Sequence, residues 1–354
     1  MAREIPGLRG MTQRFSARAV LGGSALLLVA AFVAGAVSGA YAISLSQLWN
    51  VLMTLGQGAD KSPEHLVFLN IRLPRLVLGV AAGAGLGMAG TLMQGLFRNP
   101  LADPGLVGIS SGAALAAGVT IVLGAWFWPV LPRTLGSWTL VLMAFGGGLS
   151  VTLLIYGLSR SEGGTRMALM LLAGIAVNAL AGAGLGFLSV MATDEQLRSL
   201  QFWLLGSLGG ARWSAVLLVA AAVALACVAA RSLAAPLNAI ALGEAQAALL
   251  GVDVERTKRR AIVVTAVAVG AVTATTGIIG FIGLIAPHWV RMVAGPDHRV
   301  VLPASALLGA ALVLAADTVA RTVMAPAELP LGVLTAFIGV PMFLWMLRHF
   351  KGRI

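Results

Sequence analysis

The sequence predicts an all-α membrane protein that crosses the bilayer about ten times. Of its 354 residues, 59% are hydrophobic and only 10% are charged, whereas a soluble domain carries about 25% charged residues. Apolar stretches long enough for a hydrocarbon core of ~30 Å recur along the whole chain. The apolar side chains are too many to be buried in a soluble domain, and only lipid can cover the rest. A soluble fold is therefore excluded.

The apolar windows define ten candidate spans. They lie near residues 19–40, 74–96, 107–127, 136–158, 167–191, 213–232, 260–278, 279–294, 302–323 and 331–348. The first follows basic residues, as in a signal peptide, but its apolar run is longer than the roughly 7–15 residues of such a signal, so we expect a retained helix. Gly277, Gly280 and Gly283 leave two interpretations open for 260–294, either a turn between two spans or two half-helices.

The connections between spans are too short for a soluble domain. The longest hydrophilic ones are residues 41–73, 192–212 and 233–259. We therefore interpret residues 1–354 as a single transmembrane domain. Whatever the chain does, it does within the membrane or through partners.

Lysine and arginine residues predict the orientation. With the N-terminus in the cytoplasm, the inner segments hold 17 of the 24 Lys and Arg residues and the outer segments hold 7. This asymmetry follows the positive-inside rule and predicts two cytoplasmic termini. It also accounts for the net charge of +11 without a nucleic-acid partner, because the basic residues are scattered between spans and form no patch.

Residues 70–112 form the most unusual segment. It begins at Arg72-Leu73-Pro74-Arg75, and it breaks at a polar turn from Arg98 to Pro104. Between these ends lie Gly83, Gly85, Gly87 and Gly90. In water each helical Gly costs about 1 kcal/mol relative to Ala, but in a bilayer small residues let helices approach closely. We predict a tightly packed span with a functional group of residues at each end.

A weak internal repeat accompanies this segment. A shift of 187 residues places Gly83, Ala84 and Gly90 on Gly270, Ala271 and Gly277. Repeated halves around a central pathway are a common plan of transporters.

The sequence contains no motif for catalysis or energy conversion. It has no GxxxxGK[ST] phosphate loop, no HExxH and no CxxC, and the single cysteine, Cys227, cannot form an internal disulfide. The histidines lie at predicted span ends or in loops, so we expect no metal site. Asp317 and Arg321 lie four residues apart near the end of one span and predict an ion pair. Intramembrane carboxylates mark ion paths, and they are scarce here, so we expect the energy source to lie outside the chain. We also expect no permanently bound cofactor.

The inner connection 233–259 predicts a site for a soluble partner. Its sequence indicates a short helix that begins near Asn238, a residue type suited to the N-cap, and stops at Gly251. A basic cluster from Arg256 to Arg260 follows, and its side chains are expected to extend to the membrane surface. Such a helix is suited to docking into a groove of a cytoplasmic protein, and a passive interfacial helix is the alternative.

Several separate motifs resemble those of one family. They are Arg72-Leu73-Pro74-Arg75, Gln94 to Pro104, Leu242-Gly243-Glu244-Ala245 with Leu250-Gly251, Gly280 to His288, Gly295 to Arg299, and Glu328-Leu329-Pro330. Together they resemble the FecCD permeases, the membrane subunits of type II ATP-binding cassette (ABC) importers of iron–siderophore complexes, haem and cobalamin. The resemblance extends from about residue 40 to the C-terminus.

The resemblance implies a fold and a set of partners. Family members are ten-helix subunits of the bacterial inner membrane that form a homodimer around a central path. Two cytoplasmic ATPase subunits lie beneath this dimer, and a periplasmic substrate-binding protein docks above it. ATP is then used by the partner subunits, so the chain itself is expected not to be an enzyme and to have no catalytic residue.

The resemblance also implies roles for individual residues on the outer side. Arg72, Arg75 and Arg321 match arginines that receive acidic residues of the binding protein. All three lie on the predicted outer side, and arginine suits this role because its planar fork binds carboxylates in a fixed orientation.

On the inner side, the resemblance implies a gate and a coupling helix. Asn99, Pro100 and Leu101 match a turn that closes the cytoplasmic gate, and the loop from Ser161 to Thr165 resembles a companion gate that includes Gly164. The residues that match the ATPase-coupling helix are Leu242, Gly243, Glu244, Ala245 and Gly251, with Glu244 on its polar side.

The predicted cargo is haem, with ferric siderophores and cobalamin as alternatives. The stretches Trp203 to Gly209 and Pro326 to Gly332 look most like those of haem permeases. Methionines along the path would suit a flat apolar ligand, although methionine is more often ordinary packing; these are Met88, Met93, Met167 and Met170. Two alternatives belong to other classes, an ion-coupled secondary transporter and a non-transporting scaffold. The scarce carboxylates disfavour the first, and the interrupted helices disfavour the second.

Overall fold

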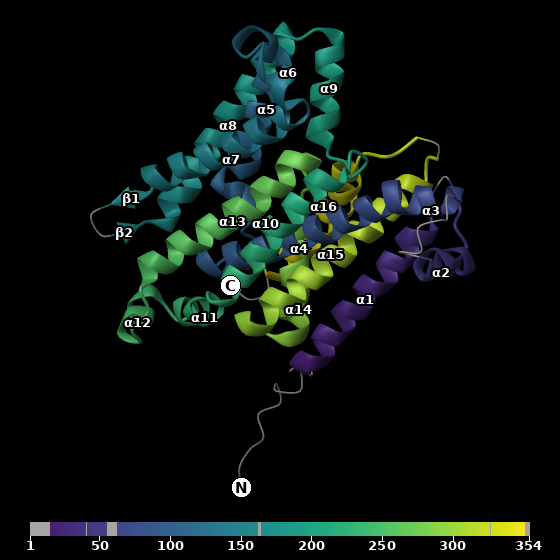
Figure 1. Ribbon diagram of the computed structural model, residues 1–354. Helices are drawn as coiled ribbons and strands as arrows, with labels where there is room; N and C mark the ends of the chain where they lie inside the picture. Colours follow the sequence, from purple (N-terminus) through teal and green to yellow (C-terminus); the bar gives the residue numbers. More distant parts are fainter. Residues whose placement is uncertain (1–14, 40, 55–61, 162–163, 326, 351–354) are drawn as a thin grey trace.

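The computed structural model describes residues 15–39, 41–54, 62–161, 164–325 and 327–350. Figure 1 shows a bundle of inclined helices with one short two-stranded hairpin. The all-α prediction is therefore confirmed. The first part of the chain forms α1 (Ala17–Val37), α2 (Leu45–Met53), α3 (Pro63–Val67), the π-helical turn η1 (Phe68–Arg72), α4 (Leu73–Leu96), the 3₁₀ turn η2 (Pro104–Val107), α5 (Ile109–Phe127), α6 (Leu131–Leu135) and α7 (Trp138–Leu158).

The hairpin opens the second part of the chain. Its strands β1 (Arg160–Ser161) and β2 (Gly164–Thr165) pair antiparallel. The helices that follow are α8 (Met167–Met191), α9 (Asp194–Leu205), α10 (Trp213–Arg231), α11 (Ala234–Ala241), α12 (Glu244–Leu249), α13 (Val254–Thr276), α14 (Ile282–Ala294), α15 (His298–Thr322) and α16 (Leu331–Phe350).

The apolar helices correspond to the ten predicted spans, but two of them are short. Within the described ranges, eight helices are long and apolar enough to cross a membrane, and Ile282–Ala294 and Leu331–Met346 are shorter apolar helices. The 13 residues of α14 cover only ~20 Å at 1.5 Å per residue. Gly277 and Phe281, both with positive φ (71° and 66°), separate α14 from α13. A turn thus separates a full-length span, α13, from a short helix, α14, and the interpretation of the pair as half-helices holds for α14 alone.

Helix α4 is the centre of the bundle. Twenty of its 24 residues are buried, because α10, α13, α14 and α15 all pack against it. A methyl group at Gly83 would overlap the carbonyl oxygen of Gly309 in α15, and one at Gly90 would overlap that of Gly283 in α14. The predicted tight packing of this glycine-rich span is confirmed.

The segment ahead of α4 is helical where the sequence suggested only a hydrophilic connection. Residues 41–73 contain α2, α3 and η1, and the chain is helical without a break from α3 into α4. Pro74 supplies no N–H to the helix. Immediately before it, the π turn shifts the hydrogen bonding, so that Leu73 N donates to Phe68 O. As a result, Arg72 and Arg75 lie within one continuous helix.

The connection 233–259 forms two short helices and not one. Gly243, with a φ of +128°, separates α11 from α12. At the end of α12, Val252 N donates to Ala247 O while Gly251 has a φ of +81°, which is a Schellman motif. The predicted stop at Gly251 is confirmed. The predicted N-cap at Asn238 is wrong, because this residue lies within α11 and its side chain hydrogen-bonds to residues 297 and 298.

Replacing Gly90 by Ala tests the packing of α4. The added methyl group has no space beside the backbone of α14, and overpacking a core costs typically about 1–3 kcal/mol. We expect a lower midpoint of thermal unfolding in detergent. Gly182→Ala is the matched control, because a methyl group at Gly182 in α8 meets nothing within 4 Å. Equal midpoints for both variants would contradict the close approach.

Candidate functional site

Five charged side chains meet at one end of the bundle. We call them the arginine cluster, and its members are Arg72, Arg75, Asp317, Arg321 and Glu328. They come from η1, α4, α15 and the connection before α16. The three arginines expose only 4%, 8% and 9% of their surfaces, and Asp317 exposes 1%. The structure therefore brings the three predicted docking arginines together, but it buries them around a carboxylate.

Asp317 holds two of these arginines. Arg75 Nε donates to both carboxylate oxygens of Asp317, at 3.0 and 3.1 Å, and Nη2 donates to Oδ1 at 2.9 Å. Arg321 Nε lies 3.1 Å from Asp317 Oδ2, so the predicted Asp317–Arg321 ion pair is confirmed. On its other edge, Arg75 donates from Nη1 and Nη2 to the two oxygens of Glu328, at 2.8 and 2.9 Å. Two carboxylates thus fix the orientation of one guanidinium plane.

The remaining donors of the cluster bind the C-terminal end of α1. Arg72 donates to the carbonyl oxygens of Ala36 and Tyr41. Arg321 donates to those of Gly35, at 3.1 Å, and Ser38, at 3.3 Å. The last carbonyl groups of a helix lack partners within it and attract cations. The arginines therefore cap α1 and attach it to α4 and α15.

Glu328 is the most accessible member of the cluster. Its side chain is 44% exposed. Hydrogen bonds from Arg75 lower the pKa of Glu328, against the smaller opposing effect of burial. Its contact with Arg75 is fully present above the pKa of the unfolded chain and is lost as the pH falls through the lowered folded value. Because solvent screens so exposed a group, its contribution to stability is small.

A second polar cluster lies at the opposite end of the bundle (Figure 1), around a buried lysine. We call it the lysine cluster, and it consists of Lys258, Glu244, Glu255 and Thr165. Lys258 Nζ donates to Glu244 Oε2 at 2.8 Å, to Glu255 Oε1 at 3.1 Å and to the Thr165 carbonyl oxygen at 2.8 Å. Thr165 Oγ1 donates to Glu255 Oε2 at 2.7 Å. Lys258 is 2% exposed, so the prediction that the whole basic cluster extends to the membrane surface is wrong at this residue.

The predicted coupling residues surround α12. Leu242 and Gly243 form the break before it, Glu244 and Ala245 begin it, and Gly251 ends it. The structure turns the carboxylate of Glu244 toward Lys258. Three apolar side chains in and beside this helix are exposed, with 69% of Leu242, 88% of Leu249 and 66% of Leu250 accessible. Such a surface is suited to burial against a partner.

The predicted gate residues lie in two turns. Asn99, Pro100 and Leu101 follow the end of α4, where Asn99 Oδ1 accepts a hydrogen bond from Leu101 N at 2.9 Å. Gly164 and Thr165 form β2 of the hairpin. Glu162 and Gly163, which belong to the predicted companion gate, lie outside the described residues. The roles of both turns as gates stay predictions.

The other candidate ligands belong to the core. Met88, Met93 and Met170 are buried in the main hydrophobic cluster, and Met167 packs against it, so these methionines are packing residues. In the part of the chain that the structure describes, no group of three or more His, Cys, Asp or Glu side chains could hold a metal ion.

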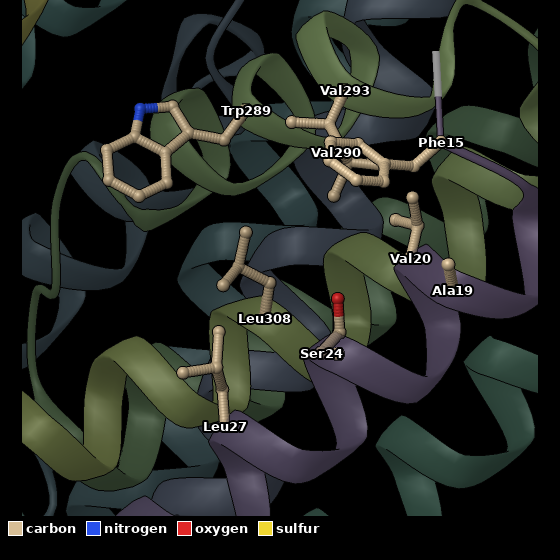
Figure 2. A pocket seen from close by; sticks show the side chains of 10 residues that line it. Phe15, Ala19, Val20, Ser24, Leu27, Trp289, Val290, Val293 and Leu308 are labelled. Atoms are coloured by element: carbon tan, nitrogen blue, oxygen red, sulfur yellow. The ribbon is translucent and has the colours of Figure 1, made fainter. Parts of the chain in front are cut away.

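An apolar pocket opens at the side of the bundle, between α1, α14 and α15. Figure 2 shows Trp289, Val290 and Val293 of α14 and Leu308 of α15 near the side chains of α1. Ser24 and the indole of Trp289 supply the polar groups among its lining side chains. A ligand site normally adds several convergent polar groups to such a lining. The pocket therefore has the character of a lipid-facing surface.

Parts of both clusters were missed by sequence reasoning. Glu255 and Lys258 lie three residues apart in one helix, a spacing that signals an ion pair. By contrast, Arg75 and Glu328 are 253 positions apart, and the contact of Thr165 with Lys258 spans 93 positions. No local pattern points to these contacts.

Neutralising Asp317 tests the arginine cluster. Asp317→Asn leaves Arg321 buried without its ion-pair partner and Arg75 with Glu328 alone, and breaking a buried ion pair in this way costs about 3–5 kcal/mol. We expect a large fall in the thermal unfolding midpoint in detergent. Glu328→Gln removes a half-exposed partner and should cost about 1 kcal/mol or less. Similar effects of the two substitutions would contradict the central position of Asp317.

Comparison with known proteins gives consistent matches along the chain. Residues 27–349 match the model of the FecCD transport family. The hemin transport system permease protein HmuU of Yersinia pestis is 45% identical over 337 residues, which cover 95% of this chain and 97% of that protein. The cobalamin import system permease protein BtuC of Halobacterium salinarum is 44% identical over 279 residues, 78% of this chain and 72% of the relative. Among solved structures, an inward-facing metal-chelate type ABC transporter matches with a TM-score of 0.81 and 30% identity, covering 94% of this chain and 99% of the other.

Proposed function

The chain belongs to the FecCD transport family, and from this membership we propose that it is the permease subunit of an ABC importer that carries haem into the cytoplasm. The observation that carries the proposal is the 45% identity to a hemin permease over 95% of the chain. The chain has no nucleotide-binding motif of its own, so a separate ATPase supplies the energy. The chain is accordingly a multi-pass subunit of the inner membrane and not an enzyme.

The partners of the proposed importer follow from the two ends of the bundle. Two permease chains form a homodimer around the path, as the resemblance to the family implies. Two cytoplasmic ATPase subunits bind the surface around α12, where Leu249 and Leu250 are exposed. A periplasmic substrate-binding protein docks at the end that carries the arginine cluster.

The distribution of basic residues supports this orientation. The elements at the α12 end carry Arg98, Arg160, Arg166, Arg231, Arg256, Lys258, Arg259, Arg260 and Arg299. Near the opposite end lie Arg72, Arg75, Arg133, Arg198, Arg212 and Arg321. Cytoplasmic segments of membrane proteins are rich in Lys and Arg. The α12 end and both termini therefore face the cytoplasm.

Docking of the binding protein requires an exchange of partners at the arginine cluster. Arg75 already binds two carboxylates, of which Asp317 is buried and Glu328 is half exposed. An incoming carboxylate can replace Glu328 without uncovering Asp317. Glu328 then acts as the internal substitute for an acidic residue of the binding protein.

Glu328→Gln tests this exchange. The neutral amide of glutamine holds Arg75 less strongly than the carboxylate does. The binding protein should therefore associate with the permease up to about fivefold more tightly, because a partly exposed ion pair contributes about 1 kcal/mol or less. Arg75→Lys should weaken association, because lysine keeps the charge for Asp317 but loses the planar fork. Affinity is measured by titrating binding protein onto permease in nanodiscs. Arg212→Met, at an exposed arginine of the same end, is the control. Weaker or unchanged binding by the Glu328 variant would exclude the exchange.

At the cytoplasmic end, Asn99, Pro100 and Leu101 together with Gly164 and Thr165 form the proposed gate. Leu101 is partly exposed in the turn after α4, whereas Thr165 is buried against α13. This arrangement is consistent with a mobile tip at Leu101 and a firmly attached hairpin.

The cargo is tested by direct comparison. The permease is reconstituted in proteoliposomes with its ATPase and binding protein, and ATP-dependent uptake of haem, a ferric siderophore and cobalamin is measured. We expect haem to be taken up fastest and to inhibit uptake of the other two. Preferred uptake of the siderophore or of cobalamin would reassign the substrate within the family, while uptake of none of them would contradict the proposed function.

A further inference from the structure

We propose that Lys258 is a positioning residue that joins α12 to the β1–β2 hairpin, so that both move as one unit during transport. The proposal rests on the proposed function, in which α12 contacts the ATPase and the hairpin borders the exit of the path. It assigns to a buried lysine the mechanical link between these two sites.

The geometry of the ammonium group carries the proposal. Its three N–H groups have three acceptors, which come from three different segments: Glu244 in α12, Glu255 in α13 and the Thr165 carbonyl in β2. The distances lie between 2.8 and 3.1 Å. An ammonium group has three donors and no acceptor. Each donor is thus matched by one segment of the chain.

Burial makes these contacts difficult to exchange. Lys258 is 2% exposed, so water does not readily replace a departing acceptor. If α12 and the hairpin separated, either Glu244 or Thr165 would leave the ammonium, and a buried cation would lose part of its compensation. Motion that keeps the three segments together avoids this loss.

The hairpin is also held from a second direction. Thr165 Oγ1 donates to Glu255 Oε2 at 2.7 Å. Gly164 lies so close to the same carboxylate that a methyl group there would be 2.8 Å from Glu255 Oε1. Glu255 therefore binds the hairpin and the lysine at once. The hairpin cannot move away from α13 without breaking the same cluster.

Helix α12 has few other attachments. It contains six residues, too few for a helix that is stable by itself, and among them Ala247 is the buried one. Of the ion pairs found in the described ranges, the one that involves α12 is Glu244–Lys258. If the ATPase pushes on the exposed leucines in and beside α12, the force thus passes into the bundle at Lys258.

Transport coupling tests the functional side. In proteoliposomes with ATPase and binding protein, Lys258→Met should reduce uptake per ATP hydrolysed at least tenfold, with less than a twofold change in ATP turnover. Arg259→Met, which removes a charge from the neighbouring exposed position, should leave the ratio unchanged, and Lys258→Arg should restore most of it. An unchanged ratio in Lys258→Met would overturn the proposal.

A distance measurement tests the link without relying on transport. Spin labels are placed on Ala248 of α12 and Ser161 of β1, both exposed, after Cys227→Ser removes the native thiol. The permease should show one narrow distance distribution, which broadens in Lys258→Met and in the milder Glu244→Gln, a variant that keeps the shape of the side chain. Equally narrow distributions in all three proteins would overturn the link even if transport is as proposed. Absence of ATP-driven uptake by the unmodified complex would instead refute the proposed function and leave the distance result interpretable.

Discussion

The close contact of the α4 backbone with α14 and α15 is the constraint on which the rest of the structure depends. It exists because glycines such as Gly83 and Gly90 remove the side chains that would separate the helices. Because 20 of its 24 residues are buried against neighbouring helices, α4 is held firmly in the bundle. Its two ends are therefore fixed relative to each other. One carries Arg72 and Arg75, and the other leads into the turn at Asn99. The same packing would thus fix the distance between the proposed docking face and the proposed gate.

The charged groups of this chain form compensated clusters at the two ends of the bundle. In the arginine cluster Asp317 balances two arginines, and in the lysine cluster two carboxylates and a carbonyl group surround Lys258. Buried charges require such partners, because an unpaired ion in a low-dielectric interior is very unfavourable. Each cluster also contains partly exposed carboxylates, Glu328 in the arginine cluster and Glu244 and Glu255 in the lysine cluster. In the proposed function, these accessible carboxylates are points at which partner proteins would contact the two clusters.

Patterns that are local in the sequence predicted much of this structure. Apolar windows located the spans, the glycines predicted the packing of α4, and Gly251 marked the end of α12. The errors have physical causes. The π turn before Pro74 and the break at Gly243 depend on backbone geometry that residue type leaves open. The Arg75–Glu328 and Lys258–Thr165 contacts join residues that only the folded chain brings together. The docking, gating and coupling roles came from the resemblance to the FecCD family and stay predictions.

Identifying the energy source is the most direct test of the proposed function, because it distinguishes an ABC permease from a carrier that works alone. Substrate accumulation is measured in two kinds of proteoliposome. The first contains the permease alone and a proton or sodium gradient. The second contains the permease with its ATPase and binding protein, and ATP is supplied on the side of the membrane where the ATPase lies. We expect no accumulation under either ion gradient and accumulation only in the complete system with hydrolysable ATP. Gradient-driven accumulation by the permease alone would contradict the account.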